Sequence, residues 1–102
     1  MKFGLDTGTI NSIYSVLVKY PEIEEVVIYG SRAKGNYREG SDIDITLKGK
    51  KITDEVRTRV CQEIDDLNTP YLFDISIFHT LQSDSLIEHI NRVGQTFYKK
   101  EK

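Results

Sequence analysis

The chain has 102 residues, of which 38% are hydrophobic and 29% charged, and its formal net charge is -2. This length suits one compact domain with a small core, so residues 1–102 are expected to form a single domain. The low net charge argues against direct nucleic-acid binding through a broad cationic surface. A single cysteine excludes an internal disulfide, and no apolar run approaches the ~20 residues of a membrane helix. With no charged-then-apolar leader either, a cytoplasmic protein is expected.

Apolar residues at helical spacing predict three helices. The first follows the candidate N-cap Asp6 and ends before Pro21, whose ring disfavours helical backbone at the residue preceding it. The second covers residues 53–67, and the third covers residues 83–93 with Gly94 at its C-terminal cap.

Short β-branched or alternating segments predict the strands. Residues 26–29 are apolar throughout, as in a strand buried on both faces, and residues 42–47 alternate acids with aliphatic residues. A third strand is expected at 71–78 and a short edge strand at 96–98. Because no crossover helix separates the first two strands, the sequence predicts an α/β (α+β) domain with a small mixed sheet flanked by helices.

The most informative segment is the glycine-rich stretch that follows the first strand. Gly30 allows backbone N–H groups to approach a ligand closely, and Ser31 adds a hydroxyl donor, which together suit phosphate oxygens. A P-loop is excluded, because Asn36 and Tyr37 stand where that motif requires Lys and then Ser or Thr. Taken alone, the glycines fit a tight hairpin turn equally well.

Three aspartates favour a phosphate and metal site over a plain turn. Asp42 and Asp44 project from the same face of one strand, roughly 6 to 7 Å apart. Asp74 lies in an apolar strand, where a buried carboxylate needs a compensating cation. If the two strands are neighbours, three carboxylates converge, and Mg²⁺ held together with substrate phosphates is the natural counterion. The alternative is a solvent-exposed acidic strand balanced by Arg or Lys.

The combination of Gly30-Ser31, ten intervening residues, Asp42-Ile43-Asp44 and a later Asp74 resembles the minimal nucleotidyltransferases (MNT) of the DNA polymerase beta superfamily. The resemblance covers essentially the whole chain. It implies that a hydroxyl attacks the α-phosphorus of a nucleoside triphosphate, with ATP as the expected substrate, and that pyrophosphate leaves. It also implies that Gly30 and Ser31 bind the triphosphate, that Asp42 and Asp44 hold two Mg²⁺ ions, and that Asp74 helps to hold the catalytic one.

Minimal members of this family look like the antitoxin halves of HEPN/MNT toxin–antitoxin pairs. The resemblance implies that AMP is transferred to a tyrosine of a HEPN toxin, and the short chain leaves the acceptor to such a separate partner. No Arg is followed four to six residues later by His, which is the HEPN signature, so this chain is expected to be the nucleotidyltransferase half. Two alternatives stay open: a non-catalytic nucleotide-binding module that masks a HEPN partner sterically, and a nucleotide sensor. Homodimer formation is left open.

Other polar residues carry weaker signals. Three cations of the glycine-rich segment could contact the triphosphate or an acidic partner, although loop cations are usually solvated: Arg32, which ranks first, Lys34 and Arg38. Cys61 is expected to be a small core residue. His79 and His89 lack the paired spacing of a zinc site, which predicts surface or hydrogen-bonded histidines. Tyr37 fits either a contact with the nucleotide base or packing across the loop.

Overall fold

A four-stranded mixed sheet organises the chain. The computed structural model describes residues 3–35, 38 and 42–101. Its elements are α1 (Thr7–Leu17), β1 (Glu25–Tyr29), α2 (Ser31–Lys34), β2 (Ile43–Lys48), α3 (Asp54–Asp65), β3 (Phe73–Ile77), the 3-10 helix η1 (Phe78–Thr80), α4 (Asp84–Val93) and β4 (Gln95–Lys99). The strand order is β3-β2-β1-β4, in which only β2 and β3 run parallel. The predicted mixed sheet flanked by helices is confirmed.

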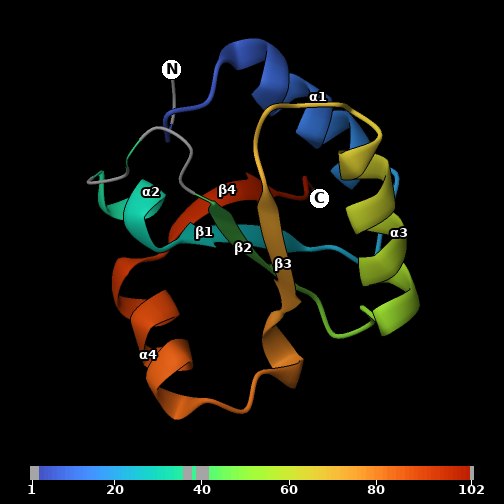
Figure 1. Ribbon diagram of the computed structural model, residues 1–102. Helices are drawn as coiled ribbons and strands as arrows, with labels where there is room; N and C mark the ends of the chain where they lie inside the picture. Colours follow the sequence, from blue (N-terminus) through green and yellow to red (C-terminus); the bar gives the residue numbers. More distant parts are fainter. Residues whose placement is uncertain (1–2, 36–37, 39–41, 102) are drawn as a thin grey trace.

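Helices cover both faces of this sheet. α1 and α3 lie on one side and α4 lies on the other (Figure 1). The larger core fills the space under α1 and α3, and its members include Ile13, Leu17, Ile28, Ile45, Val60, Ile64 and Ile77. A smaller core joins β1 to α4 through Val27, Tyr29 and Ile90. As predicted for a strand covered on both faces, β1 is buried from Val26 to Tyr29.

Side-chain caps fix where the three long helices begin. Asp6, Thr53 and Ser83 each accept a hydrogen bond from a backbone N–H in the first turn of α1, α3 and α4. Such a cap satisfies a donor that has no partner within the helix. Asp6 is therefore confirmed as the cap of α1, which ends at Leu17, ahead of the position where Pro21 would have stopped it.

Gly94 lies at the C-cap of α4 as predicted, but its backbone is not left-handed. Its φ is -66°, which any residue adopts. Glycine is needed there because a Cβ would lie 2.4 Å from the carbonyl oxygen of Ile90 and 2.6 Å from Cγ1 of Val27. The close approach of α4 to β1 therefore selects this glycine.

The short elements α2 and β4 also bear on the expectations from sequence. The segment after β1 was expected to be only a turn, but Ser31–Lys34 form the short helix α2, which ends at Gly35 in the left-handed region with φ +82°. β4 is confirmed as an edge strand. None of the helices in the described part of the chain has the length and apolar character to cross a bilayer.

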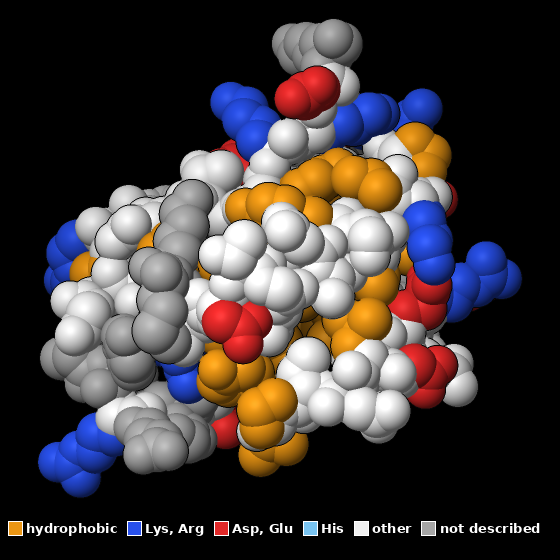
Figure 2. Space-filling view, turned by 90° about the horizontal axis from the view of Figure 1, so that it is seen from above, with side chains coloured by type: hydrophobic (Ala, Val, Ile, Leu, Met, Phe, Trp, Pro, Cys, Tyr) orange, Lys and Arg blue, Asp and Glu red, His pale blue; other side chains and the backbone are white. Residues whose placement is uncertain are grey.

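The face of the molecule over α1 carries mixed side chains. Among the atoms coloured by type in Figure 2, lysine and arginine side chains are scattered between acidic, apolar and neutral polar groups. No extended cationic surface forms on this described face.

Candidate functional site

The parallel pairing of β2 with β3 brings the predicted acids together. The register places Asp44 directly opposite Asp74, and Asp42 immediately precedes the Ile43–Phe73 pair. Ile43, Ile45 and Ile75 point into the larger core, so the aspartates project from the other face, because side chains alternate along a strand. The expected adjacency of the two acidic strands is confirmed.

The burial of the acids differs from the expectation. Asp74 is exposed rather than buried, because β3 is the outermost strand of the sheet on this side. The argument that Asp74 needs a cation to compensate its burial is therefore wrong. Asp42 is also exposed, and Asp44, on the inner strand β2, is the half-buried acid. Asp44 is therefore the aspartate whose carboxylate loses the most contact with water.

Burial and neighbouring carboxylates shape the electrostatics at Asp44. Burial raises the pKa of Asp44 above its ordinary value, and the charges of Asp74 and Asp42 raise it further, while His89 opposes the shift. Within the described residues, no salt bridge reaches any of the three aspartates. Repulsion between neighbouring carboxylates favours the protonated form of one of them or a bound cation.

The Gly30 turn lies directly against Asp44. Tyr29 and Asp44 are cross-strand partners, and Gly30 follows with φ +77°, a conformation in which other residues are strained. A Cβ at Gly30 would lie 2.6 Å from Oδ2 of Asp44. Glycine therefore lets the chain turn beside the carboxylate and leads into Ser31, the first residue of α2. The turn and the acids, which the sequence predicts to act together, therefore lie next to each other.

Arg32 is part of the interior rather than a solvated loop cation. It is 3% exposed, its Nη1 donates to the carbonyl oxygen of Phe3 at 2.9 Å, and its guanidinium lies 5.2 Å from the ring centroid of Tyr71. These contacts hold the N-terminal segment and the segment before β3 against α2. Its predicted contact with substrate stays a prediction.

The other described cations of the glycine-rich segment are exposed, whereas Arg32 is buried. Lys34 and Arg38 are exposed, as expected for loop cations. Tyr37 lies outside the described residues, so its two readings stay predictions.

Tyr29 and His89 are neighbours of the acids that sequence reasoning did not select. Burial raises the pKa of Tyr29, and Asp44 and Asp74 add to the rise, whereas the Ser76 hydroxyl opposes it. The ring of His89 meets the ring of Tyr29 edge-on, with 6.2 Å between centroids and 81° between planes. Tyr29 could have been noticed from its place before Gly30. His89 gave no signal, because its position depends on how α4 packs.

His79 and Cys61 conform to the expectations. His79 Nε2 lies 3.0 Å from the carbonyl oxygen of Ile52, as in a hydrogen-bonded histidine. Cys61 packs at the margin of the larger core, and burial raises the pKa of its thiol. Neither belongs to the sheet face from which Asp42, Asp44 and Asp74 project, which we call the acidic face.

The three aspartates have the ligand chemistry that a divalent cation needs, but their side chains are not yet grouped around a common point. Carboxylate oxygens are the ligands that Mg²⁺ prefers. Among the described residues, no three acidic, histidine or cysteine side chains are grouped closely enough to hold an ion as they stand. Binding therefore requires these side chains to turn toward one another. The two exposed acids are free of core packing, which makes such a rearrangement inexpensive.

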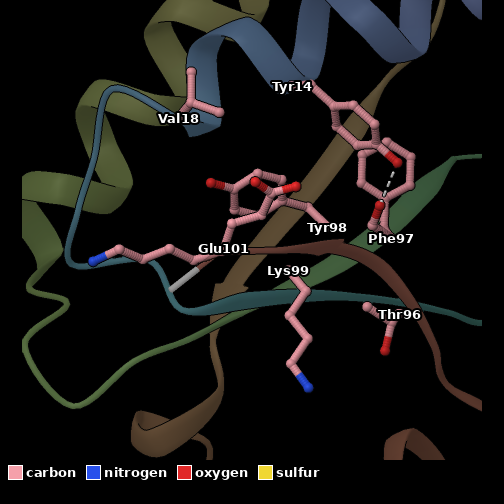
Figure 3. A pocket seen from close by; sticks show the side chains of 8 residues that line it. Tyr14, Val18, Thr96, Phe97, Tyr98, Lys99 and Glu101 are labelled. Atoms are coloured by element: carbon pink, nitrogen blue, oxygen red, sulfur yellow. Dashed lines mark hydrogen bonds between the residues drawn. The ribbon is translucent and has the colours of Figure 1, made fainter.

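A separate hollow lies elsewhere, between α1 and β4. Its volume is about 590 Å³, and its lining includes Tyr14 of α1, the C-cap residue Val18 and residues 96–101. Figure 3 shows Tyr14 pointing toward Phe97, whose carbonyl oxygen accepts a hydrogen bond from the Tyr14 hydroxyl at 2.6 Å. None of the predicted site residues lines this hollow, so the acidic site is distinct from it.

Comparison with known proteins gives a family and a fold. The family model described as polymerase beta, nucleotidyltransferase matches residues 11–102. Seventeen chains of solved structures match significantly. Among curated proteins, no sequence matches significantly.

Toxin–antitoxin complexes are among these structures. A chain of a complex with AMP-PNP superposes with a TM-score of 0.71 and 19% identity, over 90% of this chain and 74% of its own. A chain of the tri-AMPylated Shewanella oneidensis HEPN toxin in complex with MNT antitoxin gives 0.68 and 16%, over 94% and 74%. A chain of the MntA-HepT complex gives 0.67 and 16%, over 93% and 74%. At these identities the likeness shows a shared fold.

The raised pKa of Asp44 predicts a pH-dependent stability effect. A carboxyl whose folded pKa lies above its unfolded value of 3.8 destabilises the folded state when ionised. The penalty is complete above the folded pKa, shrinks as the pH falls, and is absent below 3.8. We therefore expect Asp44→Asn to raise the Tm at pH 7 in the presence of a chelator, and to lose this advantage toward pH 4. An equal gain at both pH values in thermal melts would contradict the account.

The contact between Gly30 and Asp44 is testable with a matched pair of glycine variants. Gly30→Ala and Gly35→Ala both place Ala at a positive φ, but a Cβ at Gly35 meets nothing within 4 Å. Gly35→Ala should therefore cost only the left-handed strain, about 1–2 kcal/mol of unfolding free energy. Gly30→Ala should cost more, because it also displaces Asp44. Urea unfolding of both variants measures the difference, and equal losses would show that the predicted clash has no energetic consequence.

Proposed function

We propose that this chain, which belongs to the polymerase beta nucleotidyltransferase family, is a Mg²⁺-dependent enzyme that transfers AMP from ATP to a hydroxyl of a partner protein. One observation carries the proposal: the turn at Gly30 touches Asp44, which in turn pairs in register with Asp74. A turn whose chemistry suits phosphate oxygens and acidic residues suited to divalent cations are thus adjacent on one sheet face. This adjacency is what a phosphoryl-group transfer requires.

Each residue of the site has a distinct role in this proposal. Backbone N–H groups at Gly30 and the hydroxyl of Ser31 bind the triphosphate. Asp42, Asp44 and Asp74 hold two Mg²⁺ ions, which supply neutralisation of the phosphates and of the attacking and leaving oxygens. The pKa of Asp44 supports this assignment, because its rise comes partly from carboxylate repulsion that a cation relieves. The predicted contact of Arg32 would have to form from a buried side chain.

The reaction joins the acceptor oxygen to the α-phosphorus of ATP and breaks the bond to pyrophosphate, which leaves. The acceptor hydroxyl loses its proton in the process. Asp74 is suited to receive this proton, because it is exposed at the free edge of the sheet and can meet an incoming hydroxyl directly. Asp44, half-buried on the inner strand, is better placed to hold charge than to exchange it.

The acceptor in this proposal is a tyrosine of a HEPN-domain toxin, with the present chain as its antitoxin. The support comes from similar folds: one is in a toxin–antitoxin complex with AMP-PNP, and another is in a complex that contains a tri-AMPylated HEPN toxin. The chain itself lacks the HEPN signature, so in this proposal it is the nucleotidyltransferase half. A protein partner therefore completes the reaction centre.

Intact-mass spectrometry of a HEPN-domain partner tests this function. Incubation with the present chain, ATP and Mg²⁺ should add one or more adenylyl groups. The double variant Asp42→Ala with Asp44→Ala should reduce transfer by at least about 10³-fold, because loss of electrostatic stabilisation of this kind typically costs that much.

Asp65→Ala with Asp66→Ala is the matched control, since it removes the same charge from the end of α3, which covers the opposite sheet face. This control should transfer AMP normally. Transfer that persists in the Asp42/Asp44 variant would refute the catalytic assignment. Neutralisation of the toxin by that variant without any transfer would instead favour steric masking.

A further inference from the structure

Leu72 is an apolar side chain exposed beside the acidic face. It is 72% exposed, and the other large apolar side chain with high exposure in the described chain is Val18, at 61%. An isolated exposed leucine needs no explanation by itself. The position of Leu72, immediately before β3, makes it informative.

The register fixes which face Leu72 occupies. Its carbonyl oxygen accepts a hydrogen bond from the N–H of Ile43 at 2.8 Å, so the strand pairing continues to this residue. Leu72 stands two residues before Asp74, and alternation therefore places both side chains on the same face. Asp42 and Leu72 each precede the Ile43–Phe73 pair on neighbouring strands. Leu72 thus flanks Asp42 and Asp74 at the outer edge of the sheet.

The other described sides of the acidic face are occupied. α4 covers it over β1, where His89 packs on Tyr29, and the Gly30 turn closes against Asp44. Among the described residues, β3 has no neighbouring strand on its outer side. As far as this part of the chain shows, an acceptor hydroxyl can therefore reach Asp74 over β3, past Leu72.

We propose that Leu72 is a docking contact for the acceptor protein and selects a hydroxyl carried on an apolar side chain. This inference rests on the proposed function and deepens it. A tyrosine places an apolar ring next to its hydroxyl, so the ring packs on Leu72 while the hydroxyl reaches Asp74. Burying such a pair of apolar surfaces removes them from water, which stabilises the complex. A sugar hydroxyl has no comparable apolar neighbour.

The hollow between α1 and β4 is the competing docking place. It is lined by Val18 and lies along the other edge of the sheet, away from the aspartates. A partner held there would keep its hydroxyl far from Asp74. The two exposed apolar residues therefore mark alternative sites, and equivalent substitutions distinguish them.

The experiment compares Leu72→Gln with Val18→Gln, using a HEPN-domain protein as the probe. Both changes replace an exposed apolar side chain by a neutral polar one, so neither alters the charge at the acids. We expect Leu72→Gln to raise the Kd for the HEPN protein about tenfold, as truncation of a central contact does. We also expect a higher KM for that protein in AMP transfer with little change in kcat, and an unchanged thermal shift with Mg²⁺ and ATP. Val18→Gln should leave the Kd within about twofold, as expected for a change away from the interface.

Equal Kd values for Leu72→Gln and the wild type would overturn the inference. A loss of binding in Val18→Gln alone would also overturn it. So would a wild-type chain that does not bind the HEPN protein. Binding is measured without ATP, so the docking test is independent of catalysis. If the wild type binds the protein at Leu72 but transfers no AMP, the proposed function fails and the docking surface stands.

Discussion

The parallel pairing of β2 with β3 sets Asp44 opposite Asp74, and the rest of the site depends on this register. Because side-chain direction alternates along a strand, a shift by one residue would turn the aspartates into the larger core and the isoleucines outward. The buried Ile43, Ile45 and Ile75 oppose that shift through the apolar surface they bury. The core therefore fixes the geometry of the acids. This geometry has an electrostatic cost, because the burial of Asp44 and, after it, the neighbouring carboxylates raise the pKa of Asp44.

The Gly30 turn resolves a second constraint in the same place. The chain must turn from β1 into α2 directly beside Asp44. A Cβ at position 30 would clash with the Asp44 carboxylate, so only glycine fits there. Packing is similarly tight where Gly94 brings α4 onto β1, on the sheet face that also carries the aspartates. Both positions couple the fold to the site, because β1 lies between them and carries Tyr29, which is buried beneath the acids and His89.

Much of this arrangement could be predicted from the sequence. The periodicity that placed Asp6 before α1 and the alternation of acids and aliphatic residues in β2 are local signals, and both were confirmed. The burial of Asp74 was predicted wrongly, because a single apolar strand does not reveal whether it lies at the edge of a sheet. α2 was missed since four residues show no periodicity. The buried contacts of Arg32 and the approach of His89 arise from distant segments, which local patterns cannot report.

The central claim is that the carboxylate face, once neutralised by Mg²⁺, binds a nucleoside triphosphate beside Gly30. Thermal melts of the wild type with ATP and Mg²⁺, with ATP and a chelator, and with Mg²⁺ alone test it most directly. A ligand at about a hundred times its Kd stabilises the folded state by about 2.7 kcal/mol, which raises the Tm of a domain of this size by roughly 10–20 °C. The account predicts this rise only when ATP and Mg²⁺ are both present, and predicts its loss in Asp44→Asn. The same rise with the chelator, or in Asp44→Asn, would contradict it.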